Sequence, residues 1–196
     1  MHTNYIYTFL VTKDGKKVIT GSKDKKIKVW DWVKQKLINT LLFHEDTVES
    51  LVMTVDERLM FSGGLDGKVG IWAMNGFNLI SHLISDFPIR TLTLTDDNDY
   101  LMAKEKPETR GAEGSMVYWP LEKNEDAFRI NVNLKGVDNC YMTPDNMYLA
   151  ILGKKIIEIW NIQSRTMVKS YEISCKHRQM ILKTVNGTRD SEYIMF

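Results

Sequence analysis

The segment VITGSKDKKIKVWD, residues Val18–Asp31, decides the fold of this chain. Its side chains from Ile27 to Trp30 are expected to alternate in direction with a period of two, which is typical of a half-buried β-strand. A polar turn separates this strand from the one before it. A second segment, FSGGLDGKVGIW at Phe61–Trp72, has the same order of strand, turn and strand. The two segments indicate a chain built from repeated β-hairpins.

An offset of 42 residues aligns the first part of the chain with the second. The matched pairs include His2 with His44, Thr20 with Ser62, Gly21 with Gly63, Asp24 with Asp66 and Trp30 with Trp72. Two later tryptophans continue the interval, with Trp119 47 residues after Trp72 and Trp160 41 residues after Trp119. A period of this length indicates a repeat architecture, in which each unit is one supersecondary element.

The rest of the chain also has the features of short strands joined by turns. Turn-forming residues, such as Asp14-Gly15 and the cluster Thr143–Asn146, separate stretches in which apolar residues alternate with polar ones. No long window shows a sustained helical period. The expected fold class is all-β, with strands at about 6–10, 17–21, 26–31, 36–42, 48–53, 58–62, 68–73, 78–84, 89–94, 99–103, 115–120, 127–132, 137–142, 147–152, 155–161 and 167–173.

The repeated segments resemble the WD-repeat β-propeller family, and Val18–Asp31 ends in the Trp-Asp pair itself. The resemblance implies four-stranded antiparallel blades of about 40–45 residues each. It places blades at about 2–43, 44–85, 86–133 and 134–174, and a partial fifth blade at 175–196. The expected fold over residues 1–196 is therefore an incomplete propeller ring. We expect more of the same polypeptide, or another chain, to complete it.

His44, Ser62 and Asp66 are the three residue types of a hydrolase triad. A catalytic triad is not expected twice at one spacing, yet an equivalent set occurs 42 residues earlier, with threonine in place of serine. The resemblance implies instead a buried hydrogen-bond network that includes a tryptophan, whose indole N–H needs an acceptor when buried. The two structural tetrads expected are His2, Thr20, Asp24 and Trp30, and His44, Ser62, Asp66 and Trp72.

The third and fourth blades depart from this pattern. The third blade has Lys104 at the serine position and Asp86 at the histidine position, and the fourth has no aspartate in its turn at 153–155. Both blades are therefore expected to rest on apolar packing alone. The polar segment Lys104–Gly114 is expected to be an exposed loop. The sequence leaves two interpretations of this loop open, structural drift and enlargement for binding a partner.

The composition excludes several classes of function. With 26 basic and 25 acidic residues the net charge is +1, so neither nucleic acid nor a membrane is expected as a partner. Two cysteines, Cys140 and Cys175, are too few for a four-cysteine zinc site, and Cys175 with His177 lacks two further ligands. No metal or cofactor is expected. The low cysteine content favours a reducing compartment, and a cytoplasmic location is expected, with a cilium or the cytoskeleton as the alternative.

The expected function is a non-catalytic scaffold that docks other proteins within a multi-subunit complex through its loops. Phe43 and Phe87 are the expected anchors, because exposed aromatic side chains tend to dominate binding energy. The candidate partner-binding residues are Phe43, Glu45, Asp46, Leu65, Phe87, Lys104 and Arg110. One alternative is a permanent structural component of a ciliary or other cytoskeletal assembly. A less favoured alternative is an enzyme with its site in a propeller pocket, which would need a cluster of titratable residues outside the duplicated tetrads.

Overall fold

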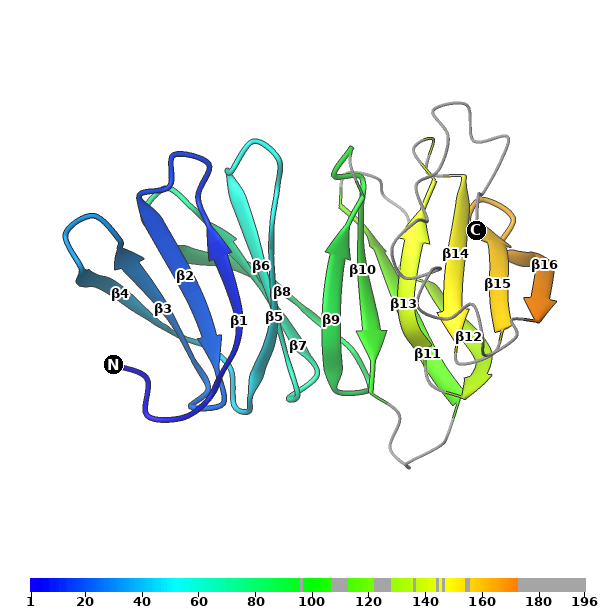
Figure 1. Ribbon diagram of the computed structural model, residues 1–196, viewed down its shortest axis with the longest axis horizontal. Helices are drawn as coiled ribbons and strands as arrows, with labels where there is room; N and C mark the ends of the chain where they lie inside the picture. Colours follow the sequence, from blue (N-terminus) through cyan, green and yellow to red (C-terminus); the bar gives the residue numbers. More distant parts are fainter. Residues whose placement is uncertain are drawn as a thin grey trace. The chain divides into compact units, whose positions relative to one another are not determined.

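The computed structural model describes residues 1–95, 97–106, 113–121, 128–135, 137–143, 145, 147–153 and 156–172. These residues form sixteen β-strands and no helix (Figure 1). The expected all-β fold is confirmed, and each expected strand forms with its ends displaced by at most three residues. The partial fifth blade expected at 175–196 lies outside the described residues.

The strands form four sheets of four strands each, and every strand pair with a described register is antiparallel. Within each sheet the strands follow chain order. The first sheet contains β1 (Ile6–Val11), β2 (Lys17–Ser22), β3 (Lys26–Asp31) and β4 (Lys36–Leu42). The second contains β5 (Val48–Met53), β6 (Leu59–Gly64), β7 (Lys68–Ala73) and β8 (Asn78–Ile84).

The third sheet contains β9 (Ile89–Leu94), β10 (Tyr100–Glu105), β11 (Glu113–Pro120) and β12 (Phe128–Lys135). The fourth contains β13 (Val137–Met142), β14 (Tyr148–Gly153), β15 (Ile156–Asn161) and β16 (Thr166–Glu172). The chain divides into two compact units, one comprising residues 1–108 and 115–129 and the other residues 109–114 and 130–196. The first unit contains the first two sheets and β9 and β10, and the second contains the fourth sheet.

The same short motif closes the hairpin between the first two strands of every sheet. A threonine hydroxyl donates a hydrogen bond to an aspartate two residues later, at 2.5–2.7 Å in the four cases. The aspartate also accepts a bond from the backbone N–H two residues further on. Such side-chain bonds favour a turn over continued strand. The four Thr–Asp pairs are Thr12 and Asp14, Thr54 and Asp56, Thr95 and Asp97, and Thr143 and Asp145.

Successive sheets of the first unit pack against one another. β1 lies beside β5, and β5 lies beside β9 (Figure 1). Apolar side chains of the first and second sheets form one buried core that includes Ile19, Val29 and Trp72. A second core lies between the second sheet and the next, and it includes Phe61 and Leu101.

Two glycines set how closely these sheets approach. A Cβ atom on Gly21 of β2 would lie 2.7 Å from Cγ1 of Val48, which belongs to the first strand of the next sheet. A Cβ atom on Gly63 of β6 would lie 2.9 Å from Cγ2 of Ile89, the equivalent residue one sheet further on. Real Cβ atoms essentially never come this close to another carbon. Each glycine therefore provides the space that a branched side chain of the following sheet fills.

We expect Gly21→Ala to destabilise the protein by about 1–3 kcal/mol, because the added methyl group overfills a packed interface. Urea unfolding measures this change in the free energy of unfolding. In the double variant with Val48→Ala, the second substitution removes one of the opposing carbons, so the combined cost should be less than the sum of the two single costs. Strictly additive costs would contradict a direct contact between positions 21 and 48.

Candidate interaction surface

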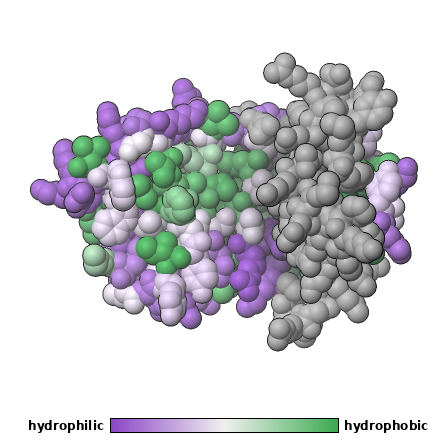
Figure 2. Space-filling view, viewed as in Figure 1, coloured by the Kyte–Doolittle hydropathy of each residue, from purple (hydrophilic) through white to green (hydrophobic). Residues whose placement is uncertain are grey.

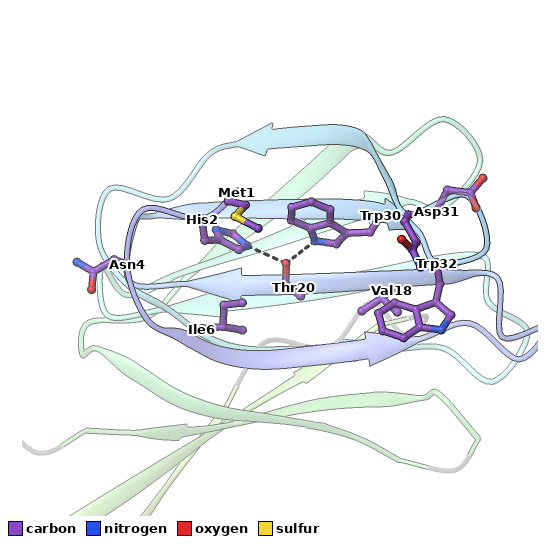
Figure 3. A pocket seen from close by; sticks show the side chains of 10 residues that line it. Met1, His2, Asn4, Ile6, Val18, Thr20, Trp30, Asp31 and Trp32 are labelled. Atoms are coloured by element: carbon purple, nitrogen blue, oxygen red, sulfur yellow. Dashed lines mark hydrogen bonds between the residues drawn. The ribbon is translucent and has the colours of Figure 1, made fainter.

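The first predicted tetrad forms a connected hydrogen-bond network in the first sheet. His2 lies between the other polar members, with Nδ1 2.8 Å from Oδ2 of Asp24 and Nε2 2.7 Å from Oγ1 of Thr20. The indole N–H of Trp30 donates to the same Thr20 oxygen at 2.9 Å. Figure 3 shows the last two bonds converging on Thr20. The network joins the segment before β1 to β2, to β3 and to the turn between them.

The second tetrad repeats this arrangement in the second sheet. Nδ1 of His44 is 3.1 Å from both carboxylate oxygens of Asp66, and Nε2 is 2.8 Å from Oγ of Ser62. Trp72 donates its indole N–H to Ser62 at 2.9 Å. The Ser62 side chain is fully buried and its oxygen is already bonded to an indole and an imidazole. A nucleophile must reach its substrate, so this geometry favours a structural role for the set.

The two aspartates also bind backbone N–H groups. Asp24 accepts from Thr3 at 3.0 Å and from Lys26 at 3.1 Å. Asp66 accepts from Glu45 at 2.8 Å and from Lys68 at 3.1 Å. Burial raises the pKa of the Asp66 carboxyl, but the hydrogen bond and charge of His44 and the two N–H donors outweigh burial and lower it overall. Each carboxylate therefore ties the linker before its sheet to the turn after the second strand.

Asp24 should make folding stability depend on pH in acid. Burial raises the pKa of its carboxyl, but hydrogen bonds from Thr3, His2 and Lys26 outweigh burial and lower the pKa from 3.8 to about 2. Since the folded pKa is the lower one, the stabilisation is present above about pH 4 and is lost as the pH falls toward about 2. Urea unfolding between about pH 5 and pH 2 should show a steeper loss for the parent than for Asp24→Asn. Parallel pH profiles would contradict this contribution.

We expect Asp66→Ala to destabilise the protein by about 1–3 kcal/mol, because it leaves His44 and two backbone N–H groups without their acceptor. Thermal and urea unfolding measure the change. The matched control is Glu45→Ala in the same linker, which removes an exposed ion pair with Lys68 at 2.7 Å. Exposed ion pairs contribute less than about 1 kcal/mol, so the control should be close to the parent. Equal losses in the two variants would argue against the network.

The expectation that the third sheet rests on apolar packing alone is wrong. Trp119 pairs with Leu101 as Trp72 pairs with Met60, so the residue equivalent to Ser62 is Ala103 and not Lys104. Two positions further along β10, the carboxylate of Glu105 is 1% exposed and accepts hydrogen bonds from the hydroxyls of Ser85 and Ser115. A buried carboxylate needs such donors. A different polar network thus replaces the tetrad.

The same expectation is wrong for the fourth sheet. The indole N–H of Trp160 donates to Oε2 of Glu158 at 3.0 Å, and Glu158 is buried. The two residues are neighbours on one face of β15, because side chains alternate along a strand. Glu158 therefore supplies the acceptor for the indole N–H of Trp160. In the first two sheets a hydroxyl group on the second strand has this role.

The predicted anchors are half-buried rather than exposed. Phe43 packs against the core between the first two sheets, with its ring centroid 5.0 Å from His44 and 6.0 Å from Trp72. Phe87 is also half-buried. The Phe43 side chain does not project freely into solvent, because the linker between the first two sheets folds back over the core. Phe43 is instead part of the packing around the second tetrad.

The other predicted partner-binding residues lie in different environments. Glu45 and Asp46 are exposed, and Asp46 binds the N–H and the hydroxyl of Thr47. Leu65 and Lys104 are half-buried. Arg110, and with it most of the Lys104–Gly114 loop, lies outside the described residues. The two interpretations of that loop therefore stay open.

The structure also has an apolar pocket that sequence reasoning missed. It has a volume of about 610 Å³ and lies on the outer face of the first sheet, the face directed away from the second sheet. Ile6, Val18, Thr20 and Trp30 line it, and Trp32 lies at its edge (Figure 3). Trp32 is 66% exposed. We call this face, with Phe9 included, the outer face of the first sheet.

Comparison with the second sheet shows how unusual this exposure is. Ile6 pairs with Ser22 as Val48 pairs with Gly64, yet Ile6 is 54% exposed and Val48 is fully buried. Phe9 and Leu51 are likewise equivalent, since they pair with the tetrad residues Thr20 and Ser62. Phe9 is 67% exposed and Leu51 4%. The sequence offset of 42 residues already matches Ile6 with Val48 and Phe9 with Leu51. The offset therefore shows that the first sheet has apolar residues at the positions that form the core in the second.

Hydrophobic side chains are also visible across the part of the first unit that carries β1 and β5, between hydrophilic side chains on either side (Figure 2). On β1, the side chains of Ile6, Tyr7, Phe9 and Val11 are all about half exposed or more. Within the described ranges, no three histidine, cysteine, aspartate or glutamate side chains are grouped so as to hold a metal ion. The described part of the chain also has no helix that could span a membrane.

The sequence matches the family model of the WD domain, G-beta repeat, at residues 1–31 and 35–73. These are the two segments that carry the tetrads. The first 73 residues therefore contain two WD repeats. Among solved structures, the β-propeller domain of Cps50 (Swd1) from Myceliophteria thermophila is similar, with a TM-score of 0.70 and 14% identity over 89% of this chain and 57% of that one. This similarity shows a β-propeller fold, and each described sheet is a blade of that fold.

Two curated proteins illustrate its relatives. Pre-mRNA-processing factor 19 from Bos taurus is 22% identical over 169 residues, which are 83% of this chain and 32% of that protein. Target of rapamycin complex subunit wat1 from Schizosaccharomyces pombe is 22% identical over 176 residues, which are 85% of this chain and 54% of that protein. The chain thus spans about a third to a half of the length of these two relatives.

Proposed function

We propose that this WD-repeat protein is a non-catalytic module that binds other proteins within a multi-subunit complex. The observation that carries the proposal is the outer face of the first sheet, where large apolar side chains that are buried in the equivalent second sheet are exposed. Contiguous exposed apolar surface is typical of a protein-binding site. One relative is by its name a subunit of the target of rapamycin complex, which supports a role of the same kind here.

The geometry of the tetrads supports the non-catalytic part of the proposal. Their hydroxyl groups are buried and already accept an indole N–H, and the histidines contact carboxylates that bind backbone N–H groups. The polar groups of each set thus satisfy one another. Such an arrangement stabilises the linker before each of the two sheets.

The proposal can be tested with Phe9→Asp in the source cells. A charge at this exposed position should disrupt binding of a partner to the outer face without disturbing the core, so the native complex should become smaller on gel filtration. The matched control is Ile80→Asp on β8, which is 57% exposed and lies on another sheet. A complex of unchanged size in Phe9→Asp, with a melting temperature like that of the control, would contradict the proposal.

A further inference from the structure

The edge of the first sheet at β4 combines exposed apolar side chains with a buried ammonium group that has no carboxylate beside it. We propose that this edge binds an extended acidic segment of another protein, which pairs with β4 as an additional β-strand. The inference goes beyond the proposed function, because it concerns a second surface of the first sheet. It does not depend on what covers the outer face.

The backbone of β4 has a hydrogen-bond donor that points away from its own sheet. β4 is the last strand of the first sheet, and no other described strand pairs with its far side (Figure 1). The N–H of Thr40 donates to Oδ1 of Asn39, the side chain of the residue before it, at 2.8 Å. A strand added at this edge can supply a backbone carbonyl to this N–H instead, as in recognition by strand addition.

Two exposed apolar side chains flank Thr40 along this edge. Ile38 is 46% exposed and Leu42 is 71% exposed. Their equivalents on β8, Ile80 and Ile84, are 57% and 68% exposed, although the first sheet packs against the second. Exposure at the edge is therefore independent of whether a neighbour covers the face of the sheet. Apolar side chains on an exposed edge strand favour pairing with another chain.

Lys28 of β3 places a positive charge beside Thr40. The two residues are register partners, and the ammonium of Lys28 donates to Oγ1 of Thr40 at 3.2 Å. Lys28 is only 8% exposed, and within the described ranges no carboxylate lies within 4 Å of its ammonium. An ammonium group has three N–H donors, and burying it without an anion is costly. The second sheet avoids this cost, because Gly70 holds the equivalent position.

A second lysine at this edge also lacks a counter-ion. Lys26 holds the register position that Lys68 holds in the second sheet. The ammonium of Lys68 binds the carboxylate of Glu45 at 2.7 Å. The offset of 42 residues places Thr3 at the position of Glu45, and no described carboxylate lies within 4 Å of the Lys26 ammonium. The edge of the first sheet therefore has two uncompensated positive charges.

The two lysines define the chemistry and the spacing of the partner. Lys26 and Lys28 are two residues apart on β3, so their side chains lie on one face of the sheet. Neighbouring strands lie about 4.8 Å apart, and the ammonium of Lys28 already reaches the side chain of Thr40 on β4. A strand beside β4 would bring one of its own side chains next to this ammonium. Aspartate or glutamate there, and again two residues along the strand, would pair with both lysines.

A second copy of the chain does not supply such a strand. Two β4 edges would bring lysines together, and like charges across strands repel. β8 and β12 contain no acidic residue, and β16 has one, Glu172. Lysines at an edge also disfavour pairing with an uncharged strand. An acidic strand of another protein is therefore the occupant that the charges of this edge favour.

The experiment replaces Leu42 with the photo-crosslinking residue p-benzoylphenylalanine in the full chain, expressed in the source cells. The matched control carries the same residue in place of Ile84, which pairs with Lys68 as Leu42 pairs with Lys26. After irradiation, mass spectrometry identifies the crosslinked molecule. We expect position 42, and not position 84, to yield a peptide of another protein with aspartate or glutamate at alternate positions.

Four other outcomes would overturn the inference. They are the absence of a crosslink at position 42, a crosslink there to nucleic acid or to this chain itself, a crosslink to a peptide without acidic residues at alternate positions, and the same product at both positions. The Phe9→Asp experiment tests the proposed function separately, because Phe9 lies on β1 and Leu42 on β4. Failure at one of these surfaces therefore does not imply failure at the other.

A second variant tests the charge of Lys28. Lys28→Met nearly keeps the size of the side chain and removes the ammonium, so the crosslink yield at position 42 should fall about tenfold, the effect of one lost charge-assisted hydrogen bond. Its melting temperature should equal or exceed that of the parent, because a buried charge without a counter-ion is removed. The control Lys34→Met, in the turn after β3, removes an exposed lysine 3.8 Å from Asp31 and should leave the yield unchanged. An unchanged yield in Lys28→Met, an equal fall in the control, or a lower melting temperature would contradict the inference.

Discussion

The close approach of the first three sheets depends on one glycine in β2 and one in β6. Gly21 and Gly63 leave space that Val48 and Ile89 fill, and a hydroxyl beside each glycine accepts a backbone N–H from the following sheet. Apolar burial drives the packing, since the cores between sheets consist of fully buried aliphatic and aromatic side chains. The glycine sets how closely the two sheets approach, and the hydroxyl pairs a backbone N–H at the same point. Packing between these sheets therefore combines apolar burial with a specific polar contact.

In every sheet the third strand has a tryptophan near its end. The indole N–H of such a tryptophan needs a hydrogen-bond acceptor when it is buried. The first two sheets use a threonine or serine that histidine and aspartate hold in place. The fourth sheet uses Glu158, two residues earlier on the same strand. In the third sheet alanine stands at the hydroxyl position, and a different buried group, the carboxylate of Glu105, is bonded to two serines. One architecture thus tolerates different polar solutions, provided that buried polar groups are paired.

The repeat of 42 residues made the strands and both tetrads predictable, because the spacing of turns, glycines and tryptophans is directly visible in the sequence. The predictions that were wrong depended on strand register or on side-chain packing, which the sequence does not show directly. A shift of one residue in the alignment of β10 assigned Lys104 to the position of Ala103, and the role of Glu105 was missed with it. Phe43 was expected to be exposed in a loop between two blades, but its ring packs against Trp72. The pocket on the outer face was missed because its lining depends on how the side chains of the first sheet pack.

The exposure of Trp32 has a spectroscopic consequence. The side chains of Trp72 and Trp119 are almost fully buried, whereas that of Trp32 is mostly in water at the edge of the outer face. Iodide or acrylamide added to the protein would quench the emission of Trp32 much more than that of the two buried indoles. A partner that covers the outer face would shield Trp32 and move its emission to shorter wavelength. The chain thus carries an intrinsic fluorophore whose signal depends on whether its first sheet is occupied.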